Sequence, residues 1–408
     1  MSNALSVALV SRSNATGGGA SRIAEELAEW LSAAGCPVVH YCAWPVGLLK
    51  RFQLPLFSSG LAGKLTRKMH SLTRRMGFNE LVPAEYFTTL RKAINKFDVV
   101  HFHDLHSAIS PTTIELCSRV KPVLFTAHDC SCFTGGCIYP LGCRGYLKQC
   151  GNCPQLPALG ARCDFTAINL GINRRLAGES NIRYIFPSKW MREAAEGSLR
   201  FAENATVIPN GFRSNGYNFL PKCDARLELG IRDQQRVVLV AAHFLGDPRK
   251  GVTFALAAIQ SVTDLAPLVI FVGIPPDDLE VQLPGIRFWL TGFVSDKRRL
   301  GLLFAASDVF LYSALEDNLP IMVQEALAAG APVVGFAAGG VSEMVDDQCT
   351  GWLCAPGNQV ALNNNLRNAL TRDDLAEFSK AARESASMRF DVDVFGQRHL
   401  DLYKQAIE

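Results

Sequence analysis

The chain has 408 residues, which corresponds to two or three domains of roughly 150 residues each. Apolar residues make up 48% of it and charged residues 19%, so there is ample material for more than one hydrophobic core. A net charge of only +3 argues against a nucleic-acid-binding protein. No apolar run approaches the roughly 18 residues that span a bilayer, and residues 1–14 lack the basic segment of a signal peptide, so we expect a cytoplasmic protein.

Short apolar, β-rich runs alternate with helical patterns along the whole sequence. Strands are predicted at residues 5–10, 37–42, 98–103, 122–127, 183–188 and 205–209, and then at 236–242, 267–273, 286–292, 308–313 and 331–336. Most of these runs are continuously apolar, which is typical of parallel strands covered on both faces. Helical patterns such as residues 21–35 lie between them. This order predicts an α/β protein with two doubly wound parallel-sheet domains.

A polar segment rich in glycine and asparagine, residues 210–218, is the best candidate for a domain boundary. We therefore divide the chain into an N-terminal domain of residues 1–214, a C-terminal domain of residues 215–390 and a final helix within 391–408. Ligands of open α/β sheets bind at the carboxyl ends of the strands, and a cleft between two such domains is the default site. The loops that follow the strands are therefore the places to look for function.

Three consecutive glycines, Gly17, Gly18 and Gly19, follow the first strand and precede a helix with Ser21 near its start. Glycines let backbone N–H groups approach an anion or a sugar, and the N-terminus of a helix adds a partial positive charge. The pattern is not GxGxxG, and a flexible turn is an equally good explanation of it.

Two cations, Arg249 and Lys250, lie after the strand at residues 236–242, where a helix begins near Gly251. Together with helix N–H groups they suit a diphosphate. The helix dipole disfavours cations at this end, so the pair favours a function over a merely solvated surface.

The loop and helix at residues 313–334 carry two carboxylates, Asp317 and Glu325. The residues Asn318, Leu319 and Pro320 resemble a helix start, which puts Glu325 about two turns into the helix. There its carboxylate can accept hydrogen bonds from a ribose or a sugar diol. An acid near a helix start often only complements the dipole, which would explain Asp317 but not Glu325.

His128 follows the apolar strand at residues 122–127. A histidine at the carboxyl end of a strand can hydrogen-bond a substrate hydroxyl or phosphate. A lone histidine has a structural role more often than a catalytic one, so both interpretations stay open.

Taken together, these loops resemble the retaining GT-B glycosyltransferases of glycosyltransferase family 4 over nearly the whole chain. The matching pieces are T-G-G-G-A-S in the first loop, V-I-P-N-G at 207–211, P-R-K-G at 248–251 and the E-x7-E-like region around E-D-N-L-P-I-M-V-Q-E. The segment that runs from His128 to Leu156 is similar to a cysteine-bearing segment of exopolysaccharide glycosyltransferases of the colanic-acid type.

The resemblance implies a GT-B fold, in which two Rossmann-like domains face a cleft and the C-terminal domain holds most of a nucleotide sugar. Arg249 and Lys250 would then hold the donor diphosphate, Glu325 would contact the ribose and Asp317 would lie near the sugar hydroxyls. The amides around Leu319 and Pro320, after Asn318, would face the phosphates or the sugar. His128 would lie by the transferred sugar, Gly18 and Gly19 would close over the diphosphate, and the final helix would cross back onto the first domain.

The implied reaction is that of a hexosyltransferase, which moves a sugar with retention from a nucleoside diphosphate onto a saccharide acceptor, often a lipid-linked one. It needs no metal cofactor, because cations and helix dipoles stabilise the leaving diphosphate, and we expect no dedicated nucleophile. The sequence departs from the family at one position: Asp317 stands where the first motif acid is usually Glu. Related polysaccharide enzymes share the D-N-x-P form, so we do not expect inactivation.

Six of the 13 cysteines lie between His128 and Cys153. Cys137, Cys143, Cys150 and Cys153 match the segment of the relatives, whereas Cys130 and Cys132 do not. The spacing C-x5-C-x6-C-x2-C can wrap a structural zinc ion, although two disulfides and four thiols are alternatives, and the spacings of iron–sulfur proteins do not fit. We predict an insertion at residues 130–163 that borders the acceptor side of the cleft and performs no chemistry itself.

Residues 61–78 have the pattern of a basic amphipathic helix. The basic residues are Lys64, Arg67, Lys68, Arg74 and Arg75, and between them recur Leu61, Leu65, Met69, Leu72, Met76 and Phe78. Such a helix suits an anionic membrane surface, although a solvated helix face would give the same pattern. Because the acceptors of the family are often lipid-linked, we expect reversible docking on the inner face of the cytoplasmic membrane.

Two other functions are weighed against the transferase. A nucleotide-sugar 2-epimerase would share the GT-B fold, but the paired cations and the D-N-L-P…E loop favour transfer. A non-enzymatic, zinc-bearing protein that holds nucleic acid is disfavoured by the near-neutral charge and by the lack of alternating aromatic and basic residues around the cysteines. The expected partners are therefore a nucleotide-sugar donor, a saccharide acceptor and the membrane, and no nucleic acid.

Overall fold

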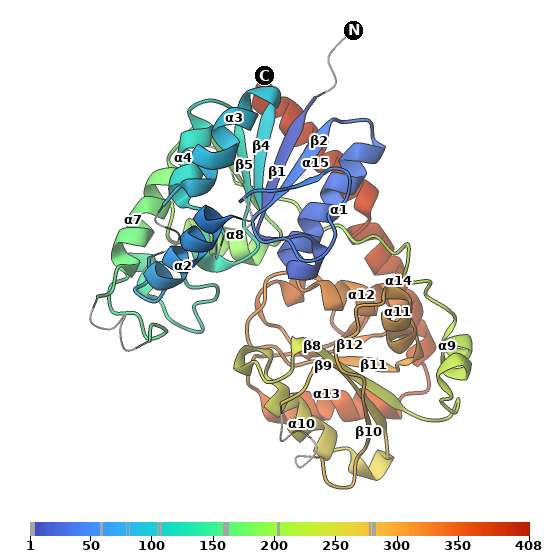
Figure 1. Ribbon diagram of the computed structural model, residues 1–408. Helices are drawn as coiled ribbons and strands as arrows, with labels where there is room; N and C mark the ends of the chain where they lie inside the picture. Colours follow the sequence, from blue (N-terminus) through green and yellow to red (C-terminus); the bar gives the residue numbers. More distant parts are fainter. Residues whose placement is uncertain are drawn as a thin grey trace. The chain divides into compact units, whose positions relative to one another are not determined.

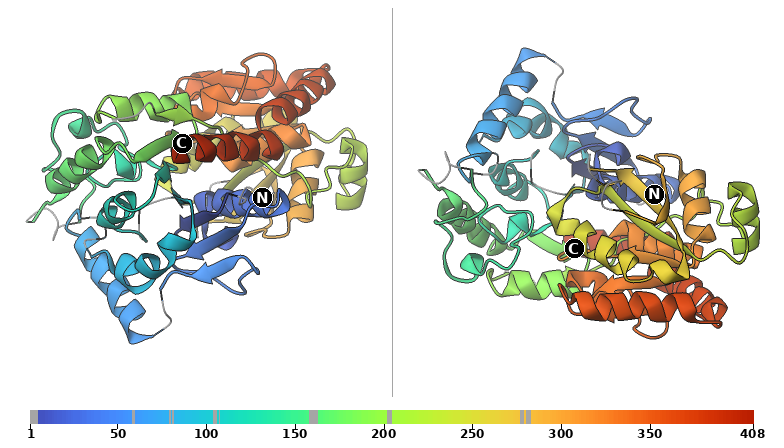
Figure 2. Two further views of the ribbon diagram at one scale, coloured as in Figure 1. Left: turned by 90° about the horizontal axis from the view of Figure 1, so that it is seen from above. Right: turned by 90° about the horizontal axis from the view of Figure 1, so that it is seen from below.

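The computed structural model describes residues 5–57, 60–78, 80, 82–103, 106, 108–157, 163–201, 205–276, 279 and 283–408. The chain forms two compact units, of which unit 1 contains residues 1–211 and 392–408 and unit 2 contains residues 212–391 (Figure 1). Each unit is a parallel sheet with helices on both faces, as further views show (Figure 2). The final helix thus belongs to the first unit, although it follows the second in the sequence. The predicted cleft stays a prediction.

Unit 1 is built on a seven-stranded sheet with the order β3-β2-β1-β4-β5-β6-β7. All its strand pairs are parallel. The strand order reverses between β1 and β4, which is where ligands of such sheets bind. The strands are β1 Val7–Ser11, β2 Val38–Cys42, β3 Gln53–Pro55, β4 Val99–His103, β5 Val123–Thr126, β6 Ile182–Phe186 and β7 Thr206–Val207.

Helices α1 Gly19–Ala33 and α15 Val392–Ile407 pack side by side in unit 1. The indole Nε1 of Trp30 on α1 donates to Oδ1 of Asp393 at 2.8 Å. A Cβ added to Gly396 on α15 would lie 2.0 Å from the ring of Trp30, so only glycine permits this close approach. Besides these, unit 1 contains α2 Leu61–Arg74, α3 Arg91–Ala93, α4 Pro111–Ser118, α5 Gly145–Lys148, α7 Thr166–Ala177 and α8 Lys189–Glu196.

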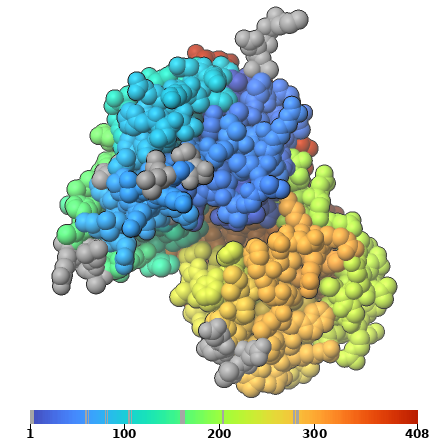
Figure 3. Space-filling model, in the orientation of Figure 1, coloured from blue at the N-terminus to red at the C-terminus, as the bar shows by residue number. Residues whose placement is uncertain are grey.

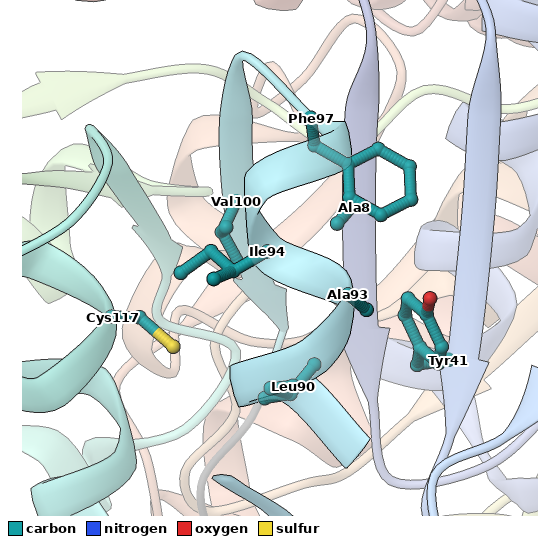
Figure 4. Close-up of a pocket in the computed structure, with 8 residues that line it drawn as sticks. All are labelled: Ala8, Tyr41, Leu90, Ala93, Ile94, Phe97, Val100 and Cys117. Atoms are coloured by element: carbon teal, nitrogen blue, oxygen red, sulfur yellow. The ribbon is translucent and has the colours of Figure 1, made fainter.

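The core of unit 1 contains a small apolar gap between the sheet and helices α3 and α4 (Figure 4). It is lined by Ala8, Tyr41, Leu90, Ala93, Ile94, Phe97, Val100 and Cys117. Ala8 and Val100 point into it because alternate residues of a strand face opposite sides of the sheet. No charged group lines this gap, which we therefore regard as part of the packed core and not as a ligand site.

Unit 2 is a six-stranded parallel sheet with the order β10-β9-β8-β11-β12-β13. Its strand order reverses between β8 and β11, in the same way as unit 1 reverses between β1 and β4. The strands are β8 Val237–Phe244, β9 Leu268–Ile274, β10 Arg287–Leu290, β11 Val309–Tyr312, β12 Val333–Phe336 and β13 Gly351–Cys354.

The strands of unit 2 are apolar on both faces because both faces are covered. Leu239, Ile270 and Phe310 pack towards α9 Lys222–Leu229, α11 Lys297–Ala306, α12 Ile321–Ala329 and α14 Leu375–Arg389. The next residues along, such as Val238 and Phe271, pack towards α10 Val252–Gln260 and α13 Gln359–Thr371.

The two doubly wound domains predicted from the sequence are confirmed. Every predicted strand is present, and β3 and β13 are two further strands that the sequence analysis did not predict. Within the described part of the chain, no helix combines the length and the apolar character that crossing a membrane requires.

Candidate active site

The loop after β8 brings its two cations against the loop after β11, at the point where the strand order of unit 2 reverses. Pro248–Lys250 form a short 3-10 helix, and Gly251 then takes a left-handed φ of +60° before α10 begins. A Cβ on Gly251 would lie 2.1 Å from the carbonyl oxygen of Ser313. Glycine is therefore needed here both for the backbone conformation and for the contact between the two loops.

Arg249, Lys250 and Asp317 form one polar cluster. The Nζ of Lys250 lies 2.6 Å from Oδ2 of Asp317, and the Nη1 of Arg249 lies 3.3 Å from the same oxygen. The hydroxyl of Tyr312, at the end of β11, donates to that oxygen as well, at 2.6 Å. Arg249 is further held by Asp247, whose Oδ2 lies 3.4 Å from its Nη2. The structure thus brings together three of the predicted site residues.

The charges of this cluster keep Asp317 ionised. Burial by itself would raise the pKa of Asp317, but Lys250, then Arg249, and the hydroxyl of Tyr312 together hold it well below its usual range. Arg249, Lys250 and Asp317 by themselves carry a net charge of +1, and Asp247, which pairs with Arg249, offsets it. The two cations at the carboxyl ends of β8 and β11 nevertheless suit an anionic ligand, to which both can donate charge-assisted hydrogen bonds.

The backbone around Asp317 is fixed by the loop after β12. Gly339 has a φ of +60°, and a Cβ there would lie 1.9 Å from the carbonyl oxygen of Asp317. The amide of Gly340 donates to that carbonyl at 3.1 Å, and the amide of Asn318 donates to Oδ1 of Asp317 at 3.0 Å. Leu319 turns its side chain into the core of unit 2. Any ligand contact at Leu319 would therefore come from its backbone.

Glu325 lies on α12, which begins at Ile321, directly after Pro320. The carboxylate is therefore little more than one turn into the helix, and not about two turns as the sequence predicted. Its side chain is buried, and the hydroxyl of Tyr217 donates to its Oε1. This pairing positions the carboxylate through a partner outside the Asp317 cluster. The predicted contact of Glu325 with a ribose stays a prediction.

In unit 1 the glycine loop follows β1, and the side chain of Asn14 forms hydrogen bonds at its start. The Oδ1 of Asn14 accepts from the hydroxyl of Thr16 at 2.9 Å and from the amide of Val46 at 3.1 Å. Gly18 has a left-handed φ of +119°, and α1 begins at Gly19. Both glycines are exposed at the helix N-terminus, where a backbone anion site would need them.

His128 lies two residues beyond β5 and is half-buried. Its Nε2 lies 3.0 Å from the Nδ1 of His103, the last residue of β4. Burial lowers the pKa of His128 to about 3, so the ring is neutral near pH 7. His128 is thus one member of a buried group of histidines and not the lone histidine considered in the sequence analysis.

The Cys-rich insertion separates into two parts. Cys130 and Cys132 are buried in the core of unit 1, which fits their absence from the shared segment. The insertion is anchored to α7, where the side-chain amide of Asn173 donates to the carbonyl oxygens of Ser131 and Thr134 at 2.9 and 3.0 Å. Part of the insertion, residues 158–162, lies outside the described residues.

The other four cysteines of the insertion, Cys137, Cys143, Cys150 and Cys153, form no disulfides in the structure. Burial, with a smaller effect of the thiols of Cys153, Cys150 and Cys143, raises the pKa of Cys137 to about 12. In the ranges that the structure describes, no group of three or more His, Cys, Asp or Glu side chains is arranged to hold a metal ion. The zinc site therefore stays a prediction.

Helix α2 forms over residues 61–74, within the predicted range, and contributes to the surface of unit 1 (Figure 3). Leu65 and Leu72 expose 64% and 53% of their surface, beside the exposed Lys64, Lys68 and Arg75. The other two basic residues turn towards the protein. The guanidinium of Arg67 lies 5.2 Å from the ring centre of Trp44, and Nε of Arg74 lies 3.4 Å from Oε1 of Glu80. The side chain of Leu61 lies outside the described residues.

Comparison with known families covers both units. Residues 17–214 match the family model described as Glycosyltransferase Family 4, and residues 235–372 match the one described as Glycosyl transferases group 1. The chain belongs to the family 4 glycosyltransferases. It is therefore a transferase, and neither the epimerase nor the non-enzymatic alternative is retained.

Among curated family members, the chain is similar to the lipopolysaccharide 1,2-N-acetylglucosaminetransferase of Salmonella typhimurium. The two are 27% identical over 238 residues, which cover 52% of this chain and 62% of the relative. It is also 24% identical over 322 residues to WcaC of Escherichia coli strain K12, named as a colanic acid biosynthesis glycosyl transferase, with 75% of each chain covered. The expected likeness to enzymes of the colanic-acid type is thus confirmed.

Among solved structures, the fold is shared with Anabaena Alr3699/HepE, solved in complex with UDP. Its TM-score is 0.68 at 19% identity, with 98% of this chain and 100% of that chain covered. The same protein has also been solved with UDP-glucose. These likenesses confirm the GT-B fold class predicted for this family member.

Three residues that contact the predicted site residues were not identified from the sequence. Tyr312 ends a strand, and its apolar neighbours hide its role as a donor to Asp317. Tyr217 lies in a loop before α9, and only its contact with Glu325 singles it out. His103 did carry a signal, because the alternation His-x-His at the end of β4 puts two polar rings on one face of a buried strand.

Proposed function

We propose that this glycosyltransferase moves one sugar, with retention, from a nucleoside diphosphate sugar to a saccharide acceptor during the synthesis of a cell-surface polysaccharide. The observation that carries the proposal is the cluster of Arg249, Lys250 and Asp317 where the strand order of unit 2 reverses. Two cations at the carboxyl ends of strands suit a diphosphate. The relatives named for lipopolysaccharide and colanic acid synthesis support the class of acceptor.

In the proposed reaction, Lys250 and Arg249 face the diphosphate and balance the charge that develops on it as the glycosidic bond breaks. Asp317 holds both cations in place before the donor binds and can accept hydrogen bonds from hydroxyls of the donor sugar. The acceptor hydroxyl attacks from the face that the phosphate leaves, and its proton passes to the oxygen of the leaving diphosphate. In this proposed reaction no side chain forms a covalent intermediate with the sugar, and the step needs no metal.

Uridine diphosphate sugars are the donors to test first, because HepE binds UDP and UDP-glucose in a similar fold. The decisive experiment measures nucleoside diphosphate release by the purified chain from a panel of UDP-, GDP- and ADP-sugars. We expect release from one donor, and we expect Lys250→Ala to abolish it. The control variant Lys380→Ala, which changes an exposed side chain on α14, should leave the release intact. Absence of release from every donor by the wild-type chain would refute the proposed function. Conversion of a donor into its 2-epimer would instead show an epimerase.

We further propose that the acceptor is lipid-linked and that α2 docks unit 1 on the inner face of the cytoplasmic membrane. Leu65 and Leu72 lie three and four residues from Lys68, so exposed leucines and a cation share one face of the helix. Apolar side chains inserted between lipids, with cations at the headgroup level, fit an anionic bilayer.

Co-sedimentation with vesicles tests this docking. The wild-type chain is expected to pellet with vesicles that contain anionic lipid and not with neutral ones. The double variant Leu65→Asp, Leu72→Asp should stay in the supernatant, whereas Leu227→Asp, at a leucine of unit 2 that is 81% exposed, should behave as the wild type. Equal pelleting with neutral and anionic vesicles would refute the membrane proposal and leave the transferase proposal standing.

A further inference from the structure

The two histidines at the ends of β4 and β5 contact each other through one nitrogen of each ring. His103 ends β4, and His128 follows β5 by two residues. The Nδ1 of His103 and the Nε2 of His128 are 3.0 Å apart, and the rings stack with a centroid distance of 5.3 Å and an angle of 20° between their planes. One of these nitrogens must donate and the other must accept.

The surroundings of His103 limit its protonation state. Its side chain has no exposed surface, and its ring centre lies 4.1 Å from that of His101. Burial, and then the neighbouring histidines, hold the pKa of His103 well below its usual range. The ring is therefore neutral at pH 7 and carries a single N–H, on either Nδ1 or Nε2.

The second nitrogen of His103 decides between these two tautomers. Its Nε2 is buried and has no hydrogen-bond partner within the described part of the chain. A buried N–H without an acceptor is less tolerable than a buried lone pair without a donor. The proton of His103 is thus expected on Nδ1, where it has an acceptor in the Nε2 of His128.

We propose that His103 is a positioning residue, which donates its Nδ1–H to Nε2 of His128 and so keeps the proton of His128 on Nδ1. His128 then presents an N–H donor, and not a lone pair, to an oxygen of the donor substrate. The assignment of the hydrogen bond rests on the geometry within unit 1. The statement about the substrate rests on the proposed function.

The neighbouring His101, whose ring plane is tilted by 40° from that of His103, is held by hydrogen bonds of its own. The Nδ1 of His101 lies 2.7 Å from the hydroxyl of Tyr403 on α15, and its Nε2 lies 2.7 Å from the hydroxyl of Thr126 on β5. Both nitrogens of His101 are thus engaged with hydroxyl groups, which can donate or accept. These bonds do not involve the contact between His103 and His128.

The direct test is the tautomer of His128, measured by two-bond 1H–15N correlation on the full-length chain and assigned by the signals that disappear in His128→Gln. The wild-type signal should show a neutral ring protonated on Nδ1. His103→Asn, which keeps an N–H donor near the position of Nδ1, should preserve this state. His103→Leu should shift His128 towards protonation on Nε2. His101→Leu is the matched control, since it removes an equally buried histidine from the same strand without touching the bond to His128.

Kinetics give a second readout that a merely structural role would not produce. In His103→Leu, kcat for donor turnover should fall on the order of 100-fold, with KM within about threefold of the wild type. His103→Asn should recover most of that loss, and His101→Leu should match His103→Leu in thermal stability but not in kcat.

Two results would overturn the proposal. One is a wild-type His128 protonated on Nε2, and the other is an unchanged tautomer in a folded His103→Leu. If the wild-type chain turned over no donor at all, the proposed function would fall, while the tautomer of His128 would still decide the hydrogen bond.

Discussion

Lys250 and Asp317 form an ion pair with 2.6 Å between Nζ and Oδ2, although 67 residues separate them in the sequence. Tyr312 donates to the same carboxylate oxygen, and Arg249 lies 3.3 Å from it. The cations are thus held in place before any ligand arrives. Preorganised charges stabilise a transition state without the cost of moving at the moment of reaction.

This arrangement predicts opposite effects of Asp317→Asn on product binding and on transfer. Removing the carboxylate charge leaves Lys250 without its acidic partner, while Arg249 keeps Asp247, so the affinity for the nucleoside diphosphate product should rise severalfold. The transfer rate should fall about 100-fold, because a contact to the donor sugar is lost and Lys250 is less well held. Titration calorimetry with the nucleoside diphosphate and steady-state kinetics with the donor measure the two quantities.

Asp247→Asn is the matched control for this prediction. Asp247 also pairs with Arg249, at 3.4 Å, and its Oδ1 caps the short helix at residues 248–250, a role that asparagine can keep. We expect less than a threefold change in either quantity. Weaker product binding in Asp317→Asn would mean that the carboxylate acts mainly by holding Lys250 in place.

The buried histidines predict that unit 1 loses stability in acid before unit 2 does. Burial lowers the pKa of His40 from an ordinary value of 6.5 to about 4. It also holds the pKa values of His101 and His103 well below 6.5. Between these values the unfolded chain binds protons that the folded chain does not. The stabilisation is therefore complete above pH 6.5 and is lost as the pH falls through about 4.

Hydrogen exchange resolved by unit, from pH 4 to pH 8, measures this effect. His40→Gln should reduce the dependence of unit 1 stability on pH by about one proton, whatever it does to the stability itself. His243→Gln, at an exposed histidine of unit 2, is the control variant. A loss of stability that is equal in both units across this range would contradict the assignment to buried histidines.

The buried Glu85 changes the stability with pH in the opposite direction to the histidines. Its side chain is buried, and Oε1 accepts from the amide of Ser110 at 2.7 Å and from the hydroxyl of Thr113 at 2.5 Å. Burial raises the pKa of Glu85 to about 7, a shift that corresponds to about 3 kcal/mol. The folded chain therefore holds a proton that the unfolded chain has lost, and stability falls as the pH rises from 4.5 to 7.

Glu85→Gln should remove this penalty, because the amide is neutral at every pH and its oxygen can keep both hydrogen bonds. We expect the free energy of unfolding to rise by about 2 kcal/mol at pH 8 and to change little at pH 5. Urea denaturation at the two pH values gives the difference, and the acid effect of the histidines cancels because it is common to variant and wild type. A gain of equal size at both pH values would show that ionisation of Glu85 is not its cause.

The sequence predicted the architecture well because both sheets are covered on both faces, which produces continuous apolar runs. It missed β3 and β13 for a physical reason. Gln53–Pro55 has three residues and contains a proline, Gly351–Cys354 has four, and both strands lie at an edge of their sheet. Such short edge strands are defined by the backbone of a neighbouring strand more than by their own pattern.

The site was predicted in part. Arg249, Lys250 and Asp317 lie in loops after strands, where charged residues stand out against the sequence around them. Tyr312 ends an apolar strand, so its hydroxyl becomes informative only when its contact with Asp317 is known. The division of α2 into a protein-facing and an exposed side also depended on neighbours, such as Trp44 beneath Arg67, that are distant in the sequence.

The four cysteines of the insertion give the last prediction, since zinc and disulfides have opposite consequences. Thiols whose pKa is raised stay protonated, and a metal ion must displace those protons to bind. An amide N–H already faces the sulfur of Cys143, from Gly145 at 3.4 Å, and such contacts stabilise a thiolate once it forms. No metal-binding group is preformed among the described residues, so zinc would have to draw the four thiols together. We propose that it does so, which predicts about one zinc per chain by elemental analysis after purification without chelator.

Cys150→Ser should abolish the zinc and lower the thermal stability of unit 1, because metal binding is coupled to folding. Cys223→Ser, at an exposed cysteine of unit 2, should retain the metal in full. Donor turnover should survive gentle removal of zinc by a chelator, since the metal is expected to shape the insertion and to take no part in the transfer. If the wild-type chain contained no metal and lost two disulfides on reduction, the zinc prediction would be wrong and the disulfide alternative would hold. Cross-linked sulfurs are unable to act as thiolate ligands.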